Sequence, residues 1–338
     1  MLRSLARILA AVVLISAIGL ASLAIALRQP TFTKLPFRGS TRADARILRK
    51  HVEFLTIDVL PRSVSHPENL ERTAAYIKLH FGAAGGDTSL QRFDARGASY
   101  VNVIARFGPA DESLPVLVVG AHYDAFGEHA ALPGADDNAS GTAGLLELAR
   151  LLGTQPPTSP VLLVAYSTEE PPFFGSHEMG SAVHARSVVG RNVRGMISLE
   201  MIGYFAEEQA WPNALFELIY PTKGDFIGVA GGWQDRKLAR HVKRAIGGAG
   251  GIRVVSFTGP RETSDASDHR NYWSHGWPAV VITDTAFLRN PNYHTKRDLA
   301  ETLDYEKMAR VVDGVLSATT APLLSTSHPP TRTTPASS

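Results

Sequence analysis

Short, almost wholly apolar runs alternate along this chain with segments in which apolar residues recur every three or four positions. The runs predict strands, and the one at residues 114–120 is apolar enough for a strand covered on both faces. We expect strands at residues 89–93, 100–107, 114–120, 161–166, 195–199, 226–230, 252–257 and 279–282. The helical spacing predicts helices at residues 43–60, 68–81, 140–152, 234–246 and 305–318. Strands that alternate with helices predict an α/β sandwich.

An apolar segment precedes these elements. Arg3 and Arg7 are followed by an uncharged stretch at residues 8–27, which is long enough to span a bilayer. The positive charge before it favours an orientation that exports everything that follows. Ala24-Ile25-Ala26 fits a cleavable signal peptide, whereas the length of the stretch fits an uncleaved anchor. Both interpretations stay open: the folded part is either membrane-anchored outside the cytoplasm, or secreted or periplasmic.

The domain organisation follows from these patterns. We expect a signal peptide or transmembrane anchor at residues 1–28 and a linker at residues 29–40. One folded domain is expected at residues 41–322. Residues 323–338 are rich in Pro, Ser and Thr, which predicts a disordered tail.

Composition narrows the functional classes. The net charge of +2 and the lack of a basic run with interleaved aromatic residues argue against nucleic acid as a partner. There is no cysteine, so disulfides, cysteine-protease chemistry and thiolate zinc sites are excluded. The oligomeric state cannot be derived from these features.

Histidine and carboxylate side chains recur where predicted strands end. His122 follows the strand at 114–120, Glu169 and Glu170 follow the strand at 161–166, and Glu200 follows the strand at 195–199. His294 lies in the loop after the strand at 279–282, and Asp137 lies on the loop after His122. Ligands gather beyond the carboxyl ends of strands in open α/β sheets. We therefore expect these side chains to meet at one edge of the sheet.

Imidazole and carboxylate oxygen are the ligands of hydrolytic zinc sites, which keep one position open for water. Two zinc ions need a shared carboxylate, and a further carboxylate must stay off the metal to take a proton from water. Asp124, two residues after His122, suits a carboxylate that orients the imidazole. Asp136 is expected to support the loop without binding metal.

Several motifs resemble those of the co-catalytic zinc aminopeptidase family, which includes bacterial leucyl-type aminopeptidases, glutamate carboxypeptidase II and glutaminyl cyclases. The resemblance covers roughly residues 43–320. It rests on Gly120-Ala121-His122-Tyr123-Asp124, Gly134-Ala135-Asp136-Asp137-Asn138-Ala139-Ser140-Gly141, Ser167-Thr168-Glu169-Glu170 and Tyr293-His294-Thr295. It implies a three-layer α/β sandwich with a mixed central β-sheet flanked by helices, the phosphorylase/hydrolase-like architecture of zinc peptidases.

The resemblance also implies roles for the residues. His122 and Glu200 are expected to bind one zinc ion, Glu170 and His294 the other, and Asp137 to bridge them, with Glu169 as the general base. The family commonly has Asp where Glu200 stands, which leaves a single zinc ion as an alternative to two.

The function that the resemblance implies is a zinc-dependent exopeptidase acting on peptides, above all an aminopeptidase. A glutaminyl cyclase-type acyltransferase is the first alternative, and a catalytically silent binding module is the second.

Overall fold

The computed structural model describes residues 2–127 and 131–322, so the tail expected at 323–338 lies outside the described residues. Within that part of the chain, an eight-stranded sheet runs in the order β1-β2-β4-β3-β5-β8-β6-β7. Its strands are β1 (Asp87–Ala95), β2 (Ala98–Phe107), β3 (Val116–His122), β4 (Val161–Tyr166), β5 (Val193–Leu199), β6 (Phe226–Gly232), β7 (Arg253–Gly259) and β8 (Ala279–Thr283).

The sheet is mixed. β4, β3, β5 and β8 are parallel neighbours, whereas β1, β2 and β6 each form an antiparallel pair. The expected mixed sheet is thus confirmed, and each predicted strand overlaps an observed one. The strand predicted at 114–120 is displaced by two residues, so that His122 is the last residue of β3 rather than the start of a loop.

The helices expected from apolar periodicity are present as α2 (Ala45–Glu53), α3 (Pro67–Ala83), α4 (Gly141–Thr154), α7 (Arg236–Ala249) and α9 (Tyr305–Thr320). The first of them continues as a π-helical turn at Phe54–Asp58. Three short helices were not predicted: α5 (Gly180–Ser187), α6 (Ala214–Ile219) and α8 (Arg270–Trp273). Segments of four to eight residues carry too few turns for a periodic pattern to be recognised.

Alternating side chains of β3 separate the two faces of the sheet. Leu117 and Val119 enter the larger core, which also contains residues of α2, α3, α4, α7 and α9. Val116 and Val118 enter a second core that contains residues of α5 and α8. Period-two alternation therefore makes β3 apolar on both faces, as expected for the centre of a three-layer sandwich.

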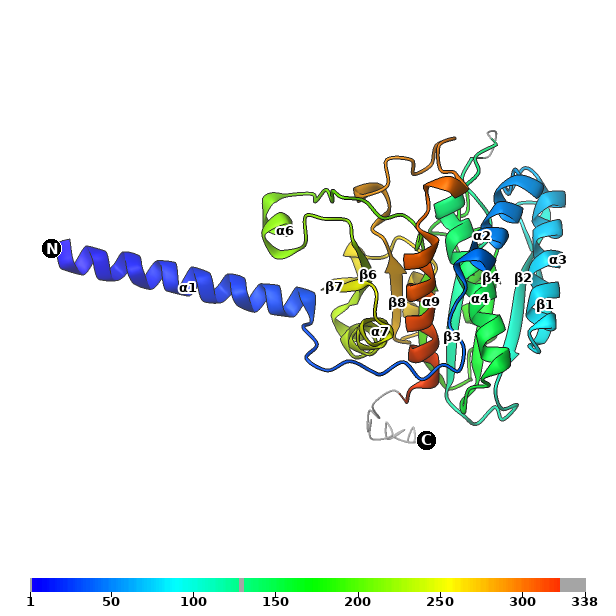
Figure 1. The fold of residues 1–338 in the computed structure, drawn as a ribbon, viewed down its shortest axis with the longest axis horizontal. Helices are drawn as coiled ribbons and strands as arrows, with labels where there is room; N and C mark the ends of the chain where they lie inside the picture. The colour runs from blue at the N-terminus through cyan, green and yellow to red at the C-terminus, as the bar shows by residue number, and fades with distance from the viewer. Residues whose placement is uncertain (1, 128–130, 323–338) are drawn as a thin grey trace, which may run out of the picture.

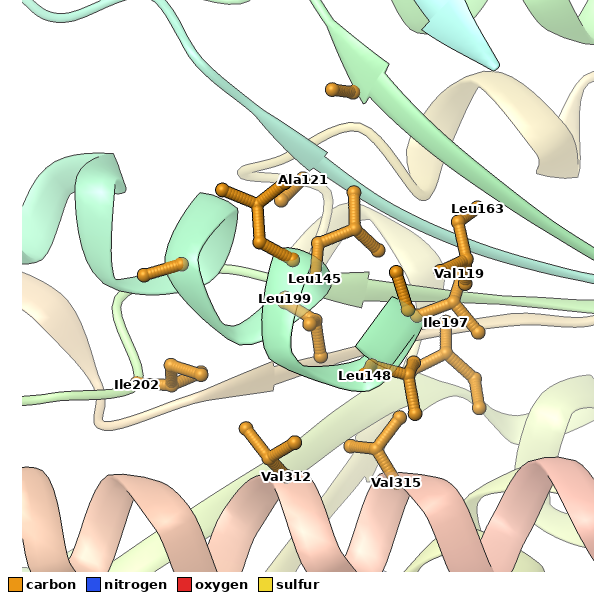
Figure 2. Close-up of a cluster of buried hydrophobic side chains, with 14 of the residues drawn as sticks. Val119, Ala121, Leu145, Leu148, Leu163, Ile197, Leu199, Ile202, Val312 and Val315 are labelled. Carbon is orange, nitrogen blue, oxygen red and sulfur yellow. The ribbon is translucent and has the colours of Figure 1, made fainter. Parts of the chain in front are cut away.

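The main core lies between the sheet and two long helices. Figure 2 shows Leu145 and Leu148 of α4 and Val312 and Val315 of α9 close to Val119 and other side chains from the strands. All four helix residues are at most 1 % exposed. Truncation of one such buried leucine to alanine typically costs about 2–5 kcal/mol. This packing holds the strand ends at fixed positions.

The N-terminal helix α1 (Leu2–Arg28) projects away from the sandwich (Figure 1). By length and apolar composition it is able to cross a membrane. Residues 29–40 then run along the domain, where Leu35 donates its backbone N–H to the Arg244 carbonyl of α7 at 3.0 Å. Leu35 and Phe37 also pack against the main core. The segment between α1 and α2 is therefore in contact with the domain.

Candidate metal centre

Most of the candidate residues lie at or beyond the ends of four neighbouring parallel strands. β3 ends at His122, Glu169 and Glu170 follow β4, Glu200 follows β5, and His294 lies in the loop beyond β8. Because β4, β3, β5 and β8 run in the same direction side by side, their carboxyl ends lie along one edge. Asp137 arrives from the π-helical turn Ala135–Ser140 between β3 and α4.

The structure brings these six side chains together. His122 Nε2 lies 3.3 Å from Glu200 Oε2, 3.4 Å from Asp137 Oδ1 and 3.9 Å from Glu169 Oε2. On the other side, His294 Nε2 lies 2.9 Å from Asp137 Oδ2 and 3.7 Å from Glu170 Oε1. The two oxygens of Asp137 thus face two different histidines.

Two groups of potential ligands share this aspartate. His122, Asp137 and Glu200 form one group, and Asp137, Glu170 and His294 form the other, with the ligand atoms of each group within 4.8 Å of one another. Within the described part of the chain, Glu170 Oε1 and His294 Nε2 are buried and make no hydrogen bond of normal geometry, although each lies near an oppositely charged group. Buried polar atoms without partners are costly, and a cation between them removes that cost. Imidazole and carboxylate donors in this number fit zinc.

The loop that carries Asp137 is tied down by two side chains. Asp298 accepts the backbone N–H groups of Asp136 and Asp137 at 2.9 and 3.1 Å. Asn138 donates to the Leu199 carbonyl at 2.9 Å and accepts the Met201 N–H at 3.1 Å. These bonds connect the Asp137 loop to the end of β5, on both sides of Glu200.

Asp124 is buried beneath the site. Its Oδ1 atom lies 3.3 Å from His122 Nδ1, and its backbone carbonyl oxygen lies 3.2 Å from the same nitrogen. It also accepts the backbone N–H groups of Glu169 and Glu170, at 3.2 and 3.0 Å. One side chain therefore positions residues on the ends of two neighbouring strands.

Asp136 points away from the histidines. Its two oxygens accept hydrogen bonds from the Gly203 backbone N–H at 3.0 Å and from Asn290 Nδ2 at 2.9 Å. Burial and the neighbouring Asp136 carboxylate raise the pKa of Asp284 well above its usual range. The Asp136 contacts therefore connect three loops around the site.

His294 is held between two aromatic rings. The Phe126 ring stacks on it at a centroid distance of 3.8 Å, and the Tyr293 ring stacks at 3.7 Å. Glu200, in turn, accepts a hydrogen bond from Ser267 Oγ at 2.8 Å. Both contacts restrict the orientation of a candidate ligand before any ion binds.

Arg62 is a buried residue that sequence reasoning missed. Its guanidinium donates to the carbonyl oxygens of Leu55, Tyr123, Pro133 and Gly134, and so connects the end of β3 with the start of the Asp137 loop. Burial lowers the pKa of Arg62 to about 10. No periodicity or motif distinguishes this arginine, or Asp298, from the surface charges of the chain.

The electrostatics of the site are dominated by buried carboxylates. Burial, with Asp137 beside it, raises the pKa of Glu170 to about 8. Burial also raises the pKa of Glu169 well above its usual range, against the opposing effect of His122. For Asp137 the burial effect is outweighed by His122 and His294, which lower its pKa. A concentration of acidic groups in a low-dielectric setting creates a strong attraction for divalent cations.

A cavity of about 530 Å³ reaches the site at Glu200. Its walls are largely apolar and include Phe257, Phe287 and Leu288, together with Leu27 of α1. A cavity of this size beside a cluster of titratable groups is the expected form of a substrate site.

The model of peptidase family M28 matches residues 102–319, which is more than half of the chain. The chain belongs to peptidase family M28. A protein of Escherichia coli (strain K12) named YfbL is 47 % identical over 299 residues, covering 86 % of this chain and 91 % of YfbL. The expectation of a zinc-peptidase resemblance and of a hydrolase is therefore confirmed at the level of the family.

Solved structures agree with the fold of an M28 peptidase. BSAP, a zinc aminopeptidase from Bacillus subtilis, matches with a TM-score of 0.65 at 15 % identity, over 84 % of this chain and 95 % of BSAP. A glutaminyl cyclase from Bacteroides thetaiotaomicron matches with a TM-score of 0.63 at 22 % identity, over 83 % of this chain and 99 % of the cyclase. The shared fold thus accommodates both kinds of enzyme.

Proposed function

We propose that this M28 peptidase is an aminopeptidase that hydrolyses the first bond of a peptide. The observation that carries the proposal is the position of Asp137 between His122 and His294, with Glu169 beside the same imidazole. A metal-dependent hydrolase needs metal ligands that leave one coordination position open for water. It also needs a further carboxylate that does not bind the metal and can take a proton from that water.

Two zinc ions are proposed. His122 and Glu200 would hold one ion, Glu170 and His294 the other, and Asp137 would contribute one oxygen to each. The two ligand groups that share Asp137 support this division. When bound, zinc polarises the scissile carbonyl and lowers the pKa of water toward about 7.

Glu169 is the proposed general base. Its carboxylate takes the proton from the attacking water and returns it to the leaving amine. The pKa of Glu169 is raised by burial, which brings a carboxylate closer to the range needed for proton transfer at neutral pH. Asp124 holds the backbone N–H of Glu169, so the base stays in place while it changes charge.

The cyclase alternative is supported by the fold match to the glutaminyl cyclase. A cyclase expels ammonia from an N-terminal glutamine and needs no water in the reaction. The presence of histidine and carboxylate donors in both ligand groups favours the hydrolase over it. The same donors argue against a silent binding module.

The test is mass spectrometry of a defined peptide mixture incubated with the full chain, purified in detergent and supplied with zinc. We expect stepwise loss of N-terminal residues. Loss of C-terminal residues would replace the aminopeptidase by a carboxypeptidase, and ammonia loss confined to peptides that begin with glutamine would replace it by a cyclase. An unchanged mixture, with folded and metal-loaded protein, would favour the binding module. The Glu169→Gln variant is the matched control for contaminating peptidases.

We also propose that α1 is kept as a membrane anchor, with the domain on the extracytoplasmic side. Thr258 Oγ1 donates to the Ala26 carbonyl at 2.8 Å, and Lys243 Nζ donates to the Arg28 carbonyl at 2.6 Å. Carbonyls at a helix C-terminus have no partner within the helix. Here the domain supplies these partners, which supports an anchor over a cleaved signal peptide.

A further inference from the structure

The last two turns of α1 pack against an apolar cluster of the domain. Leu20, Ala24 and Leu27 lie at positions that share one helix face, and they contact a group built on Ile219, Tyr220, Phe226 and Val255. Trp211, Phe216 and Phe257 also pack against that group. The domain therefore touches α1 along its final 10 Å or so, at 1.5 Å per residue.

This contact falls inside the apolar part of α1. As a helix, the uncharged stretch at residues 8–27 is about 30 Å long, which equals the hydrocarbon thickness of a bilayer. Leu20 and Ala24 belong to that stretch. If the apolar stretch of α1 spans a membrane, the domain elements that pack against its final turns therefore lie at the membrane surface.

α6 is the element at that level. It lies at the edge of the domain from which α1 projects (Figure 1), and Phe216 and Ile219 attach it to the cluster that contacts α1. Its other apolar side chains face outward: Leu218 is 69 % exposed and Leu215 is 42 % exposed. Glu217 is the one charged residue of α6, and the cost of a charge in hydrocarbon favours the depth of the lipid headgroups for this helix.

The cavity beside the metal centre is lined in part by residues of the same apolar cluster. Trp211, Phe216 and Tyr220 line it together with Leu27, and Glu200 is also part of its lining. The path from the candidate ligands to the α1–α6 surface is therefore bordered by apolar side chains. A soluble polar peptide has no apolar surface to bury along such a path. A peptide that partitions into the bilayer does, and the burial of its apolar residues is favourable in free energy.

We propose that α6 docks on the lipid surface beside α1, through Leu215 and Leu218, and that the cavity is thereby supplied with peptides held at the membrane. The substrate class of the proposed peptidase is then peptides with an apolar segment that partitions into lipid. This second statement rests on the proposed function, whereas the docking of α6 does not.

The absence of cysteine from the chain makes the docking directly measurable, because one introduced thiol takes one label. Leu218→Cys would carry an environment-sensitive fluorophore in the full chain, reconstituted into vesicles of phosphatidylcholine and phosphatidylglycerol with nitroxide-labelled lipids. Leu79→Cys is the control, because Leu79 is 68 % exposed on α3, at the opposite end of the domain (Figure 1). Thermal unfolding shows whether each labelled variant is folded.

We expect the label at 218 to shift its emission to the blue and to be quenched several-fold more strongly than the label at 79. Equal quenching at both positions would overturn the docking of α6. This readout needs no catalysis, so it stands even if the proposed peptidase activity fails.

A second measurement addresses the substrate class. Leu218→Glu should lower kcat/KM several-fold for a peptide with a C-terminal apolar segment bound to vesicles, and leave a short soluble peptide unaffected. An equal effect on both peptides, or none on the vesicle-bound one, would overturn the membrane-delivered substrate. No cleavage of either peptide by the unmodified chain would instead contradict the proposed function.

Discussion

His294 Nε2 lies 2.9 Å from Asp137 Oδ2, although the two residues come from the loops that follow β8 and β3, which β5 separates in the sheet. The other oxygen of the same carboxylate lies 3.4 Å from His122 Nε2. Replacing Asp137 removes the group common to both ligand sets, whereas replacing a histidine removes a member of one set.

Asp137→Asn should therefore reduce the zinc content of the purified chain at both sites, because an amide has no charge and offers one oxygen. Metal content by mass spectrometry after dialysis is the measurement. Asp136→Asn is the adjacent control, since its oxygens bond Gly203 and Asn290, and it should keep its zinc. A variant pair with the opposite pattern would contradict the assignment of the bridging ligand.

Glu169→Gln should keep its zinc and lose activity by about 10²–10⁴-fold, the usual contribution of a general base. The amide is nearly the same size, so the loop held by Asp124 should be preserved. Steady-state kinetics and metal analysis on the same sample provide the comparison. Glu208→Gln, at an exposed position, serves as the control and should match the unmodified chain. Near-normal turnover by Glu169→Gln would rule out this base.

Arg62→Lys should lower the free energy of unfolding by about 1–3 kcal/mol for each buried carbonyl that loses its donor. One ammonium cannot reach the four carbonyl groups that the guanidinium contacts. Denaturant unfolding of the full chain in detergent measures the loss. The exposed Arg236→Lys should stay within about 0.5 kcal/mol. An equal, small effect at both positions would mean that Arg62 does not support the loop.

His184 makes stability depend on pH. Burial, with the charge of Arg191 as the smaller cause, lowers the pKa of His184 to about 3 in the folded chain. Between about pH 3 and the unfolded value near 6.5, the unfolded chain binds a proton that the folded chain does not. Stability should therefore fall as the pH drops below 6.5, by about 2 kcal/mol at pH 5 from this residue.

His184→Asn removes that titration and keeps a side chain able to bond the Tyr272 hydroxyl, which lies 2.6 Å from His184 Nδ1. Between pH 7.5 and pH 5 the variant should lose about 2 kcal/mol less unfolding free energy than the unmodified chain. The difference between the two chains cancels the contributions of all other groups, the metal centre included. Parallel losses would show that the pKa of His184 is the same in the folded and unfolded chains.

The strands were predictable because buried strands consist almost entirely of apolar residues. β4 is buried along its whole length and is apolar along its whole length. The end of β3 was less clear, since His122 is polar and yet is paired with Tyr166 of β4 as a strand residue. α6 was missed because six residues carry too few turns for a periodic pattern, and four of them are exposed: Ala214, Leu215, Glu217 and Leu218.

Part of the candidate site could also be predicted from local sequence. The motifs around His122, Asp137, Glu169 and His294 carry their residue types in short, local order. The supporting groups do not: Arg62 and Asp298 act through hydrogen bonds to backbone atoms far away in the chain. These hydrogen-bond partners depend on which loops lie next to one another in the folded chain, and local sequence does not determine that.

The sequence by itself determined the class of fold, the apolar N-terminal helix and the kinds of side chain available for chemistry, because hydrophobic periodicity and short motifs are local properties. Only the tertiary structure decided which oxygen of Asp137 faces which histidine, that Arg62 is buried among carbonyls, and that α1 and α6 share a wall of the cavity. These relationships arise from the parallel alignment of β4, β3, β5 and β8 and from long-range packing, which bring together residues that are distant along the chain.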